Sequence, residues 1–261
     1  MNCFGIVGCG KMGQALVSGM RPELADTPLI CCDVSEEALK ATQKILGDHA
    51  TMTQELDEVA AKADVILLCV KPAQAPGVLR RLNDGPRKVI LSIVAGLTHA
   101  RLSECAPAHI CVRIMPNTPA LVGAGTSVIY DSKLPQPVRA LAERLFGRTG
   151  GCHFVDHEEM MDAVTGLSGS TPALFAMMIE ALADAGVAEG LPRATAFALA
   201  RETMLGTAKL LECQHPAILK ENVMSPGGTT AAGVLAAEKA GFRQAAAAFV
   251  CAASQKSRQM S

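Results

Sequence analysis

The feature that most constrains the fold is a glycine-rich loop set between an apolar strand and a helix. Residues 3–7 predict a short buried strand, and a helical pattern covers residues 12–20. The connecting loop reads Gly8-Cys9-Gly10-Lys11-Met12-Gly13, which matches G-x-G-x-x-G. Glycines here allow a tight turn, a close approach to a pyrophosphate and close packing of helix on strand, and the helix start then binds the anion. This context favours a dinucleotide site over an ordinary tight turn.

An acidic residue stands where the second expected strand ends. Asp33 follows the apolar run 29–32 and lies about twenty positions beyond Gly13, where a carboxylate accepts a hydrogen bond from the adenosine ribose 2′-OH. The alternative is a surface aspartate after a turn. The same carboxylate repels a 2′-phosphate, and neither Val34 nor Ser35 supplies an arginine. The cofactor is therefore NADPH or NADH, with a weak preference for NADH.

The first half of the chain alternates short apolar runs with amphipathic stretches. Such alternation indicates a parallel sheet with helices on both faces, and the closer spacing of the last strands allows an antiparallel edge. Besides 3–7 and 29–32, the expected strands are residues 65–70, 89–94, 110–115, 127–130 and 153–155. Besides 12–20, the expected helices are residues 36–46, 55–62 and 138–146.

Three further segments end apolar runs with Pro, Gly or Asn. Ligands of doubly wound sheets bind at the carboxyl ends of the strands, so we expect cofactor contacts from these segments. The residues concerned are Cys69, Val70, Lys71, Pro72, Ala95, Gly96 and Asn117. A solvated charge is an equal alternative for Lys71, and a turn-capping side chain is an equal alternative for Asn117.

The composition changes near Asp156. From Met160 onward Ala, Leu and Met dominate, no strand pattern stands out, and Gly and Pro divide long helical patterns. We therefore predict a Rossmann-type α/β domain over residues 1–157 and an all-α domain over residues 158–261. Helix starts are expected with Thr171 as N-cap before Pro172, and with Pro192 and Pro216 at first helical positions; the last helix covers about 242–260.

Charge and cysteine usage exclude several classes of protein. The net charge is −1 and no Lys/Arg run occurs, so no nucleic-acid or membrane surface is expected. The 10 cysteines do not have the spacing of zinc ligands. Those in apolar runs are interpreted as small buried hydrophobic residues. So many unpaired thiols indicate a reducing compartment, the cytoplasm. No apolar run is expected to span a bilayer, and the early strand leaves no room for a signal peptide.

Two later segments combine glycine with hydroxyl residues before helical patterns. They are residues 166–172 (GLSGSTP) and 225–230 (SPGGTT). Free N–H groups and hydroxyls at the positive end of a helix dipole suit a carboxylate ligand. Two capped turns between helices are an equally good interpretation.

Together these residues resemble one family, the pyrroline-5-carboxylate reductases. The resemblance covers nearly the whole chain, through residues 8–13, 70–72, 112–124 and 181–192, and is most specific at 225–230. It implies reduction of Δ1-pyrroline-5-carboxylate to L-proline by NAD(P)H. It also implies a helical domain that forms a homodimer, dimers that assemble into rings, and an active site shared between neighbouring subunits.

The resemblance also implies roles for individual residues. It places Thr230 beside the ring nitrogen of the substrate, as the catalytic contact. The implied substrate-binding residues are Ser225, Gly227, Gly228 and Thr229 at the carboxylate, with Ser170 and Thr171 lining the pocket. The chain departs from the usual family pattern at Thr171, where Gly is common, and at Leu174, where an aromatic is common. Residues 54–57 also lack the Asn that usually reaches the adenosine side.

This chemistry needs little acid–base machinery, because a protonated cyclic imine accepts a hydride once the nicotinamide C4 is held over it. Two other readings remain. A β-hydroxyacid dehydrogenase would use a helix lysine, but no Lys stands between Pro172 and Lys209. A dinucleotide sensor without activity would explain the first domain and leave residues 225–230 without a role.

Overall fold

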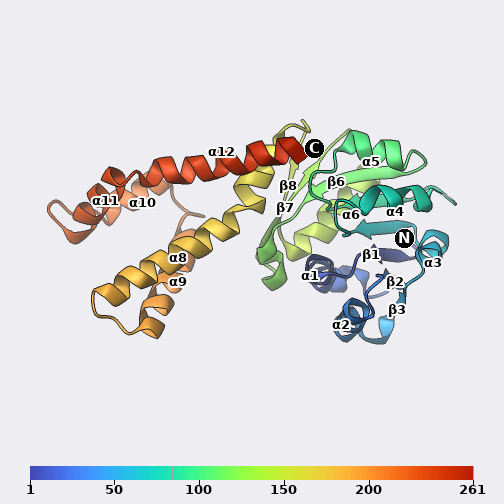
Figure 1. Ribbon diagram of the computed structural model, residues 1–261, viewed down its shortest axis with the longest axis horizontal. Helices are drawn as coiled ribbons and strands as arrows, with labels where there is room; N and C mark the ends of the chain where they lie inside the picture. The colour runs from blue at the N-terminus through green and yellow to red at the C-terminus, as the bar shows by residue number, and fades with distance from the viewer. Residues whose placement is uncertain (84, 261) are drawn as a thin grey trace. The chain divides into compact units, whose positions relative to one another are not determined.

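The computed structural model describes residues 1–83 and 85–260 (Figure 1). By its internal contacts the chain divides into two compact units. The first, which we call the dinucleotide unit, comprises Met1–Ser170 together with the chain from Ala252 onward. The second, the helical unit, comprises Thr171–Cys251.

An eight-stranded sheet forms the centre of the dinucleotide unit, in the order β3-β2-β1-β4-β5-β6-β7-β8. The strands are β1 Phe4–Val7, β2 Leu29–Cys32, β3 Ala50–Thr53, β4 Val65–Leu68, β5 Val89–Ser92, β6 Ile110–Met115, β7 Gly125–Tyr130 and β8 Gly150–Val155. Neighbours pair in parallel except β6 and β7, which confirms the antiparallel edge. β3 was not predicted, because this edge strand reads Ala-Thr-Met-Thr and lacks an apolar run.

Helices cover both faces of the sheet, as the alternating pattern predicts. One buried cluster joins the sheet to α1, α2 and α6 through residues such as Leu16, Leu39 and Leu145. The other joins it to α3, α4 and α5, of which α4 and α5 were not predicted. The helices of this unit are α1 Lys11–Met20, α2 Glu36–Leu46, α3 Leu56–Lys62, α4 Ala75–Leu82, α5 His99–Cys105, α6 Gln136–Phe146 and α7 Met160–Val164. Single 3-10 turns are η1 Arg21–Leu24, η2 Gly47–His49, η3 Thr118–Val122 and η4 Gly147–Thr149.

The glycine-rich segment 166–172 is not a turn between helices. A π-helical turn, η5 Thr165–Gly169, joins α7 directly to α8 Thr171–Ala188, and the Ser170 N–H donates to the Thr165 carbonyl at 2.9 Å. The expectation that Thr171 is an N-cap is therefore wrong, because the preceding residues already wind helically. The continuous helix Met160–Ala188 is long and apolar enough to cross a membrane by length and composition, which corrects the expectation that no such run exists.

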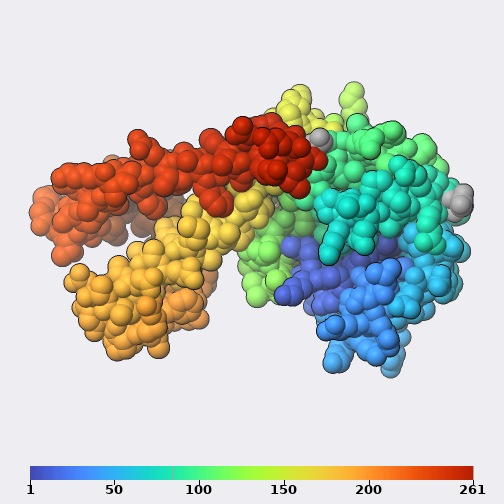
Figure 2. All heavy atoms as spheres, viewed as in Figure 1, coloured from blue at the N-terminus to red at the C-terminus, as the bar shows by residue number. Residues whose placement is uncertain are grey.

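The helical unit continues with α9 Arg193–Leu210, α10 Pro216–Asn222, α11 Thr229–Lys239 and the first part of α12 Phe242–Met260. Pro216 begins α10 as predicted, whereas Pro192 is the N-cap of α9 rather than its first helical residue. In Figure 2 the residues of this unit are coloured from yellow through orange to red. Within residues 171–251 the fully buried apolar side chains are those of Ala183 and Ala196. The unit therefore has almost no core of its own.

Candidate active site

The glycine-rich loop is fixed by close contact with the end of β4. Gly8 has φ of +97°, and a side chain there would meet the Cys69 carbonyl carbon at 2.6 Å. A Cβ on Gly13 would meet the Gly8 carbonyl oxygen at 2.4 Å. Only glycine fits at either position. β1 and β4 are neighbours in the sheet although they are not consecutive in the chain, so the loop lies at the topological switch point where doubly wound sheets bind ligands.

The same loop offers space and hydrogen-bond donors to a pyrophosphate. Gly10 is the N-cap of α1 without a side-chain cap, and a Cβ added to it would meet no atom within 4 Å. The first N–H groups of α1 have no partner inside the helix, and they lie at the positive end of its dipole. Lys11 is exposed and Met12 half-buried beside them. These observations fit a dinucleotide cofactor, which supplies the hydride when it is bound.

Asp33 is tied to this loop by direct hydrogen bonds. Its Oδ2 accepts from the Cys9 backbone N–H at 2.7 Å, and its Oδ1 accepts from the Ser35 backbone N–H at 2.8 Å. Ser35 then caps α2, its hydroxyl oxygen accepting from the Ala38 N–H at 3.3 Å. The carboxylate therefore connects the ends of β1 and β2. Sequence reasoning expected a ribose contact here but not the bond to Cys9.

The other predicted cofactor residues follow the carboxyl ends of the parallel strands, on one edge of the sheet. Cys69, Val70, Lys71 and Pro72 follow β4, Ala95 and Gly96 follow β5, and Asn117 follows β6. Lys71 is exposed, as both of its interpretations require. The buried Asn117 amide has partners of its own: its Oδ1 accepts from the Thr126 N–H at 2.8 Å and its Nδ2 donates to the Ser168 carbonyl at 3.2 Å. The side chain therefore connects β7 and η5, and it is not the turn cap of the alternative interpretation, because it makes no cap bond to η3.

Two thiols at this edge, those of Cys32 and Cys69, are held in the protonated form. Burial, together with the nearby Cys9 and Asp33, raises the pKa of the Cys32 thiol to about 11. The pKa of Cys69 is raised by burial as well. Protonated thiols of this kind act as small hydrophobes rather than nucleophiles.

A cavity of about 270 Å³ in the dinucleotide unit brings predicted residues together with others that the sequence did not indicate. Ala95 and Gly96 share it with Ser170 and with Lys256 and Ser257 from the end of α12. The Met260 carbonyl oxygen lies 3.1 Å from where a Gly96 side chain would begin. The last turns of α12 therefore form part of the wall beside the β5 end. Only the polar interruption of an Ala-rich helix marks them in the sequence.

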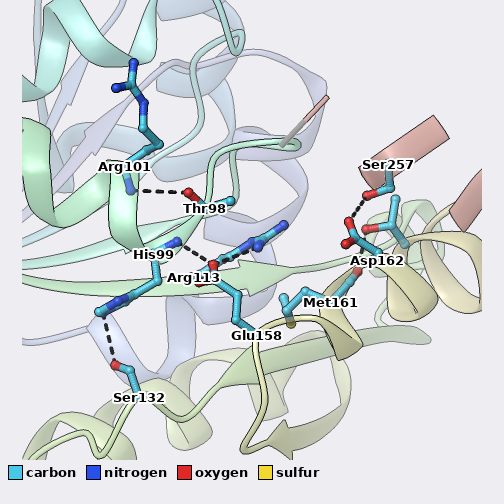
Figure 3. Close-up of polar contacts among 10 residues, drawn as sticks. Thr98, His99, Arg101, Arg113, Ser132, Glu158, Met161, Asp162 and Ser257 are labelled. Carbon is cyan, nitrogen blue, oxygen red and sulfur yellow. Dashed lines mark hydrogen bonds and ion pairs between the residues drawn. The ribbon is translucent and has the colours of Figure 1, made fainter. Parts of the chain in front are cut away.

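Two polar contacts hold the walls of this region (Figure 3). The buried Arg113 of β6 donates to Glu158 at 2.7 Å, and the same carboxylate accepts from the His99 N–H at the start of α5. The Ser257 hydroxyl donates to Asp162 at 2.6 Å, which joins α12 to α7. The first contact fixes the chain shortly after Gly96, and the second fixes the helix that carries Lys256.

The second predicted segment lies in the helical unit and forms a tight turn before α11. The Gly228 N–H donates to the Ser225 carbonyl at 3.0 Å, with Pro226 second and Gly227 third at φ of +69°. This is the residue pattern of a type II turn. Gly228 is the N-cap of α11 without a side-chain bond, so Thr229 and Thr230 are its first two residues. The helix start presents N–H groups and two hydroxyls, a suitable site for a carboxylate. Thr171, also predicted to bind substrate, begins α8 and is buried.

The doubly wound sheet and its glycine loop define a nicotinamide-dinucleotide-dependent oxidoreductase. Residues 3–96 match the family model "NADP oxidoreductase coenzyme F420-dependent", and residues 158–260 match the model "Pyrroline-5-carboxylate reductase dimerisation". A pyrroline-5-carboxylate reductase of Synechocystis is 42% identical over 98% of this chain and 97% of that protein. The chain belongs to the pyrroline-5-carboxylate reductase family.

Solved structures agree with this assignment. A pyrroline-5-carboxylate reductase from Coxiella burnetii superposes with a TM-score of 0.90 at 28% identity, covering 99% of this chain and 98% of that one. Pyrroline carboxylate reductase from Plasmodium falciparum, a structure with NADP bound, superposes with a TM-score of 0.86 at 30% identity over 99% and 98%. The likeness includes both the sheet and the helical part of the chain.

Proposed function

We propose that this chain reduces Δ1-pyrroline-5-carboxylate to L-proline by hydride transfer from NADH or NADPH. The observation that carries the proposal is the pairing of two anion-binding helix starts in one chain. One follows the glycine loop at the switch point of the sheet, and the other follows the Ser225–Gly228 turn. Membership of the reductase family supports the same activity.

Different residues bind the cofactor and the substrate in the proposed reaction. The loop of residues 8–13 and the start of α1 bind the pyrophosphate, and the segments after β4, β5 and β6 border the nicotinamide half of the cofactor. Ser225, Gly227, Gly228 and Thr229 bind the substrate carboxylate at the start of α11, with Ser170 and Thr171 lining the pocket. The Thr230 hydroxyl holds the protonated ring nitrogen, so that the imine carbon faces the hydride donor and the nitrogen becomes the amine of proline.

The same assignment supports a proposal for the assembly and location of the protein. The dimerisation match over residues 158–260 supports a homodimer. We further propose that the dimers can join into a ring, that the active site is shared between neighbouring subunits, and that the enzyme is cytoplasmic. The sequence domains are proposed as residues 1–157 and 158–261.

A steady-state assay with pyrroline-5-carboxylate tests the activity directly. NADH or NADPH should be oxidised only when the imine is added, and proline should accumulate in equal amount. A Gly13→Val variant should be inactive, because its side chain would collide with the Gly8 carbonyl. Oxidation of a β-hydroxyacid by NAD⁺ would favour the dehydrogenase alternative. Cofactor binding without any turnover would favour a sensor.

A further inference from the structure

We propose that this site binds NADH in preference to NADPH. Asp33 sets the preference, because its carboxylate stands where the 2′-phosphate of NADPH would have to bind. The inference rests on the proposed function and narrows its cofactor. It does not follow from the family, since the Plasmodium structure has NADP bound.

The argument begins with how Asp33 is held. One carboxylate oxygen accepts the Cys9 N–H at 2.7 Å and the other accepts the Ser35 N–H at 2.8 Å. Each carboxylate oxygen can accept two hydrogen bonds, so one acceptor position remains on each. A ribose carries two neighbouring hydroxyl donors, the 2′-OH and the 3′-OH. The oriented carboxylate therefore fits an unmodified adenosine ribose.

A 2′-phosphate in place of the 2′-OH would interact unfavourably with the same carboxylate. It carries a charge of about −1.5 to −2 at pH 7 and offers acceptors rather than donors. It would lie against a carboxylate of the same sign. At the end of β2 the Ser35 N–H is already engaged by Asp33, which leaves the Ser35 hydroxyl, whose oxygen accepts from the Ala38 N–H, as a neutral donor. The end of β2 thus presents a carboxylate where a phosphate is best held by cationic donors.

The neighbouring cations are paired with carboxylates. Lys40 pairs with Glu36 at 2.7 Å on α2, and Arg81 pairs with Asp57 at 2.9 Å. Arg81 also lies close enough to Cys32 to lower the pKa of its thiol, and Glu55 acts on the same thiol in the opposite direction. Lys11 at the start of α1 is suited to the pyrophosphate, which both cofactors share.

Equilibrium binding measures this preference without turnover. NADH and NADPH are titrated separately into the full-length protein by isothermal calorimetry, in the absence of pyrroline-5-carboxylate. We expect the Kd for NADH to be lower by about tenfold or more, the effect of one charged hydrogen bond gained and one repulsion avoided. The ratio should narrow at high salt, because screening weakens the repulsion.

Two variants and a control test the role of Asp33 itself. Asp33→Asn should bring the two Kd values to within about threefold, chiefly by weakening NADH binding. The double variant Asp33→Ser with Val34→Arg should bind NADPH more tightly than the wild type, a gain that misfolding cannot produce. Val34 is 81% exposed, which leaves room for the arginine. Asp48→Asn removes an equal charge at the opposite end of α2 and should leave the ratio unchanged.

Wild-type protein that binds NADPH as tightly as NADH would overturn the inference. So would an Asp33→Asn variant with the wild-type ratio, which would leave Asp33 only as a residue that positions the loop. A parallel assay with pyrroline-5-carboxylate separates this failure from that of the proposed function. Turnover with NADPH preferred removes the cofactor inference alone, whereas no turnover with either cofactor removes the proposed function.

Discussion

The two units of this chain are both rich in apolar residues, yet they bury them differently. In the dinucleotide unit, large side chains such as Phe4, Leu16 and Leu67 are fully covered by the chain itself. In the helical unit, large apolar side chains remain 40% exposed or more. They are Phe175, Met177, Leu182, Leu191, Phe197, Leu199, Leu205, Leu210, Leu211, Ile218, Val223, Leu235 and Phe242.

This difference shows that apolar content does not by itself make a core. A helix with one apolar face packs onto its own domain, whereas a helix that is apolar all round needs cover on several sides. Exposed apolar side chains gathered on one part of a protein mark an interaction surface. The match to the dimerisation family model over residues 158–260 indicates that a second copy of the chain covers this surface. The dinucleotide unit should therefore fold at any dilution, and the helical unit should not.

The largest effect is expected from a charge placed on the exposed apolar surface of the helical unit, which tests whether that surface forms the dimer. Phe197→Asp, at a position 47% exposed on α9, should shift the protein from dimer to monomer. Reductase activity should fall by about a hundredfold or more, since an unpaired charge in an apolar interface costs several kcal/mol. NADH binding should survive, because the dinucleotide unit has its own core. Light scattering and calorimetry on the same sample measure the two properties, and a stable, active Phe197→Asp dimer would contradict the prediction.

The next effect concerns chemistry supplied by the helical unit. Thr230 is the second residue of α11, and Gly228 rather than a threonine is the N-cap. Thr230→Ala should therefore lower kcat/KM by roughly ten- to a hundredfold, as expected for a lost bond to a charged group, with little change in Tm. Thr207→Ala is a matched control, because its hydroxyl donates to the Thr203 carbonyl within α9. Normal turnover with a lowered Tm would show that Thr230 is structural.

A smaller effect is expected in the dinucleotide unit, at the carboxylate of Asp131. The backbone N–H of Leu134 and the Arg139 side chain lower the pKa of Asp131 below its ordinary 3.8. Its stabilisation is therefore present above that pH and lost as the pH falls through the lowered value. Asp131→Asn should reduce the free energy of unfolding by about 1–2 kcal/mol at pH 7 and by much less in acid. Denaturant titrations should give the same difference at low and high protein concentration, and a difference that grows on dilution would count against a local effect.

The smallest effect is a helix cap in the dinucleotide unit. The Thr98 hydroxyl oxygen accepts from the Arg101 N–H at 3.2 Å at the start of α5. Thr98→Ala should cost about 1 kcal/mol of stability, and Thr98→Ser should cost little. Dimerisation should be unchanged in both. A cost shared equally by the two variants would show that the cap bond contributes nothing.

The sequence predicts the sheet well because its buried strands are apolar runs and its loop contains the glycines that a switch point needs. Gly8 has the positive φ that its place in the motif predicts, and Asp33 lies beside the loop as its place after β2 predicts. The continuous helix from Met160 to Ala188 was missed because glycine and proline in residues 166–172 are typical of turns, whereas the structure keeps them helical through a π turn. Lys256 was missed because only tertiary contact brings the end of α12 beside Ala95 and Gly96. The roles of the individual site residues stay predictions.

The dinucleotide unit is discontinuous in the chain, because it leaves at Ser170 and resumes at Ala252. A ribosome adding 5–20 residues per second needs on the order of ten seconds to make the intervening segment. During that time the nascent sheet lacks Ser257 for Asp162 and the α12 turn that lies on Gly96. Apolar helices of the unpartnered unit emerge meanwhile. A chaperone that shields residues 171–251 during synthesis would therefore protect the later closure of the cofactor domain as well as the dimer surface.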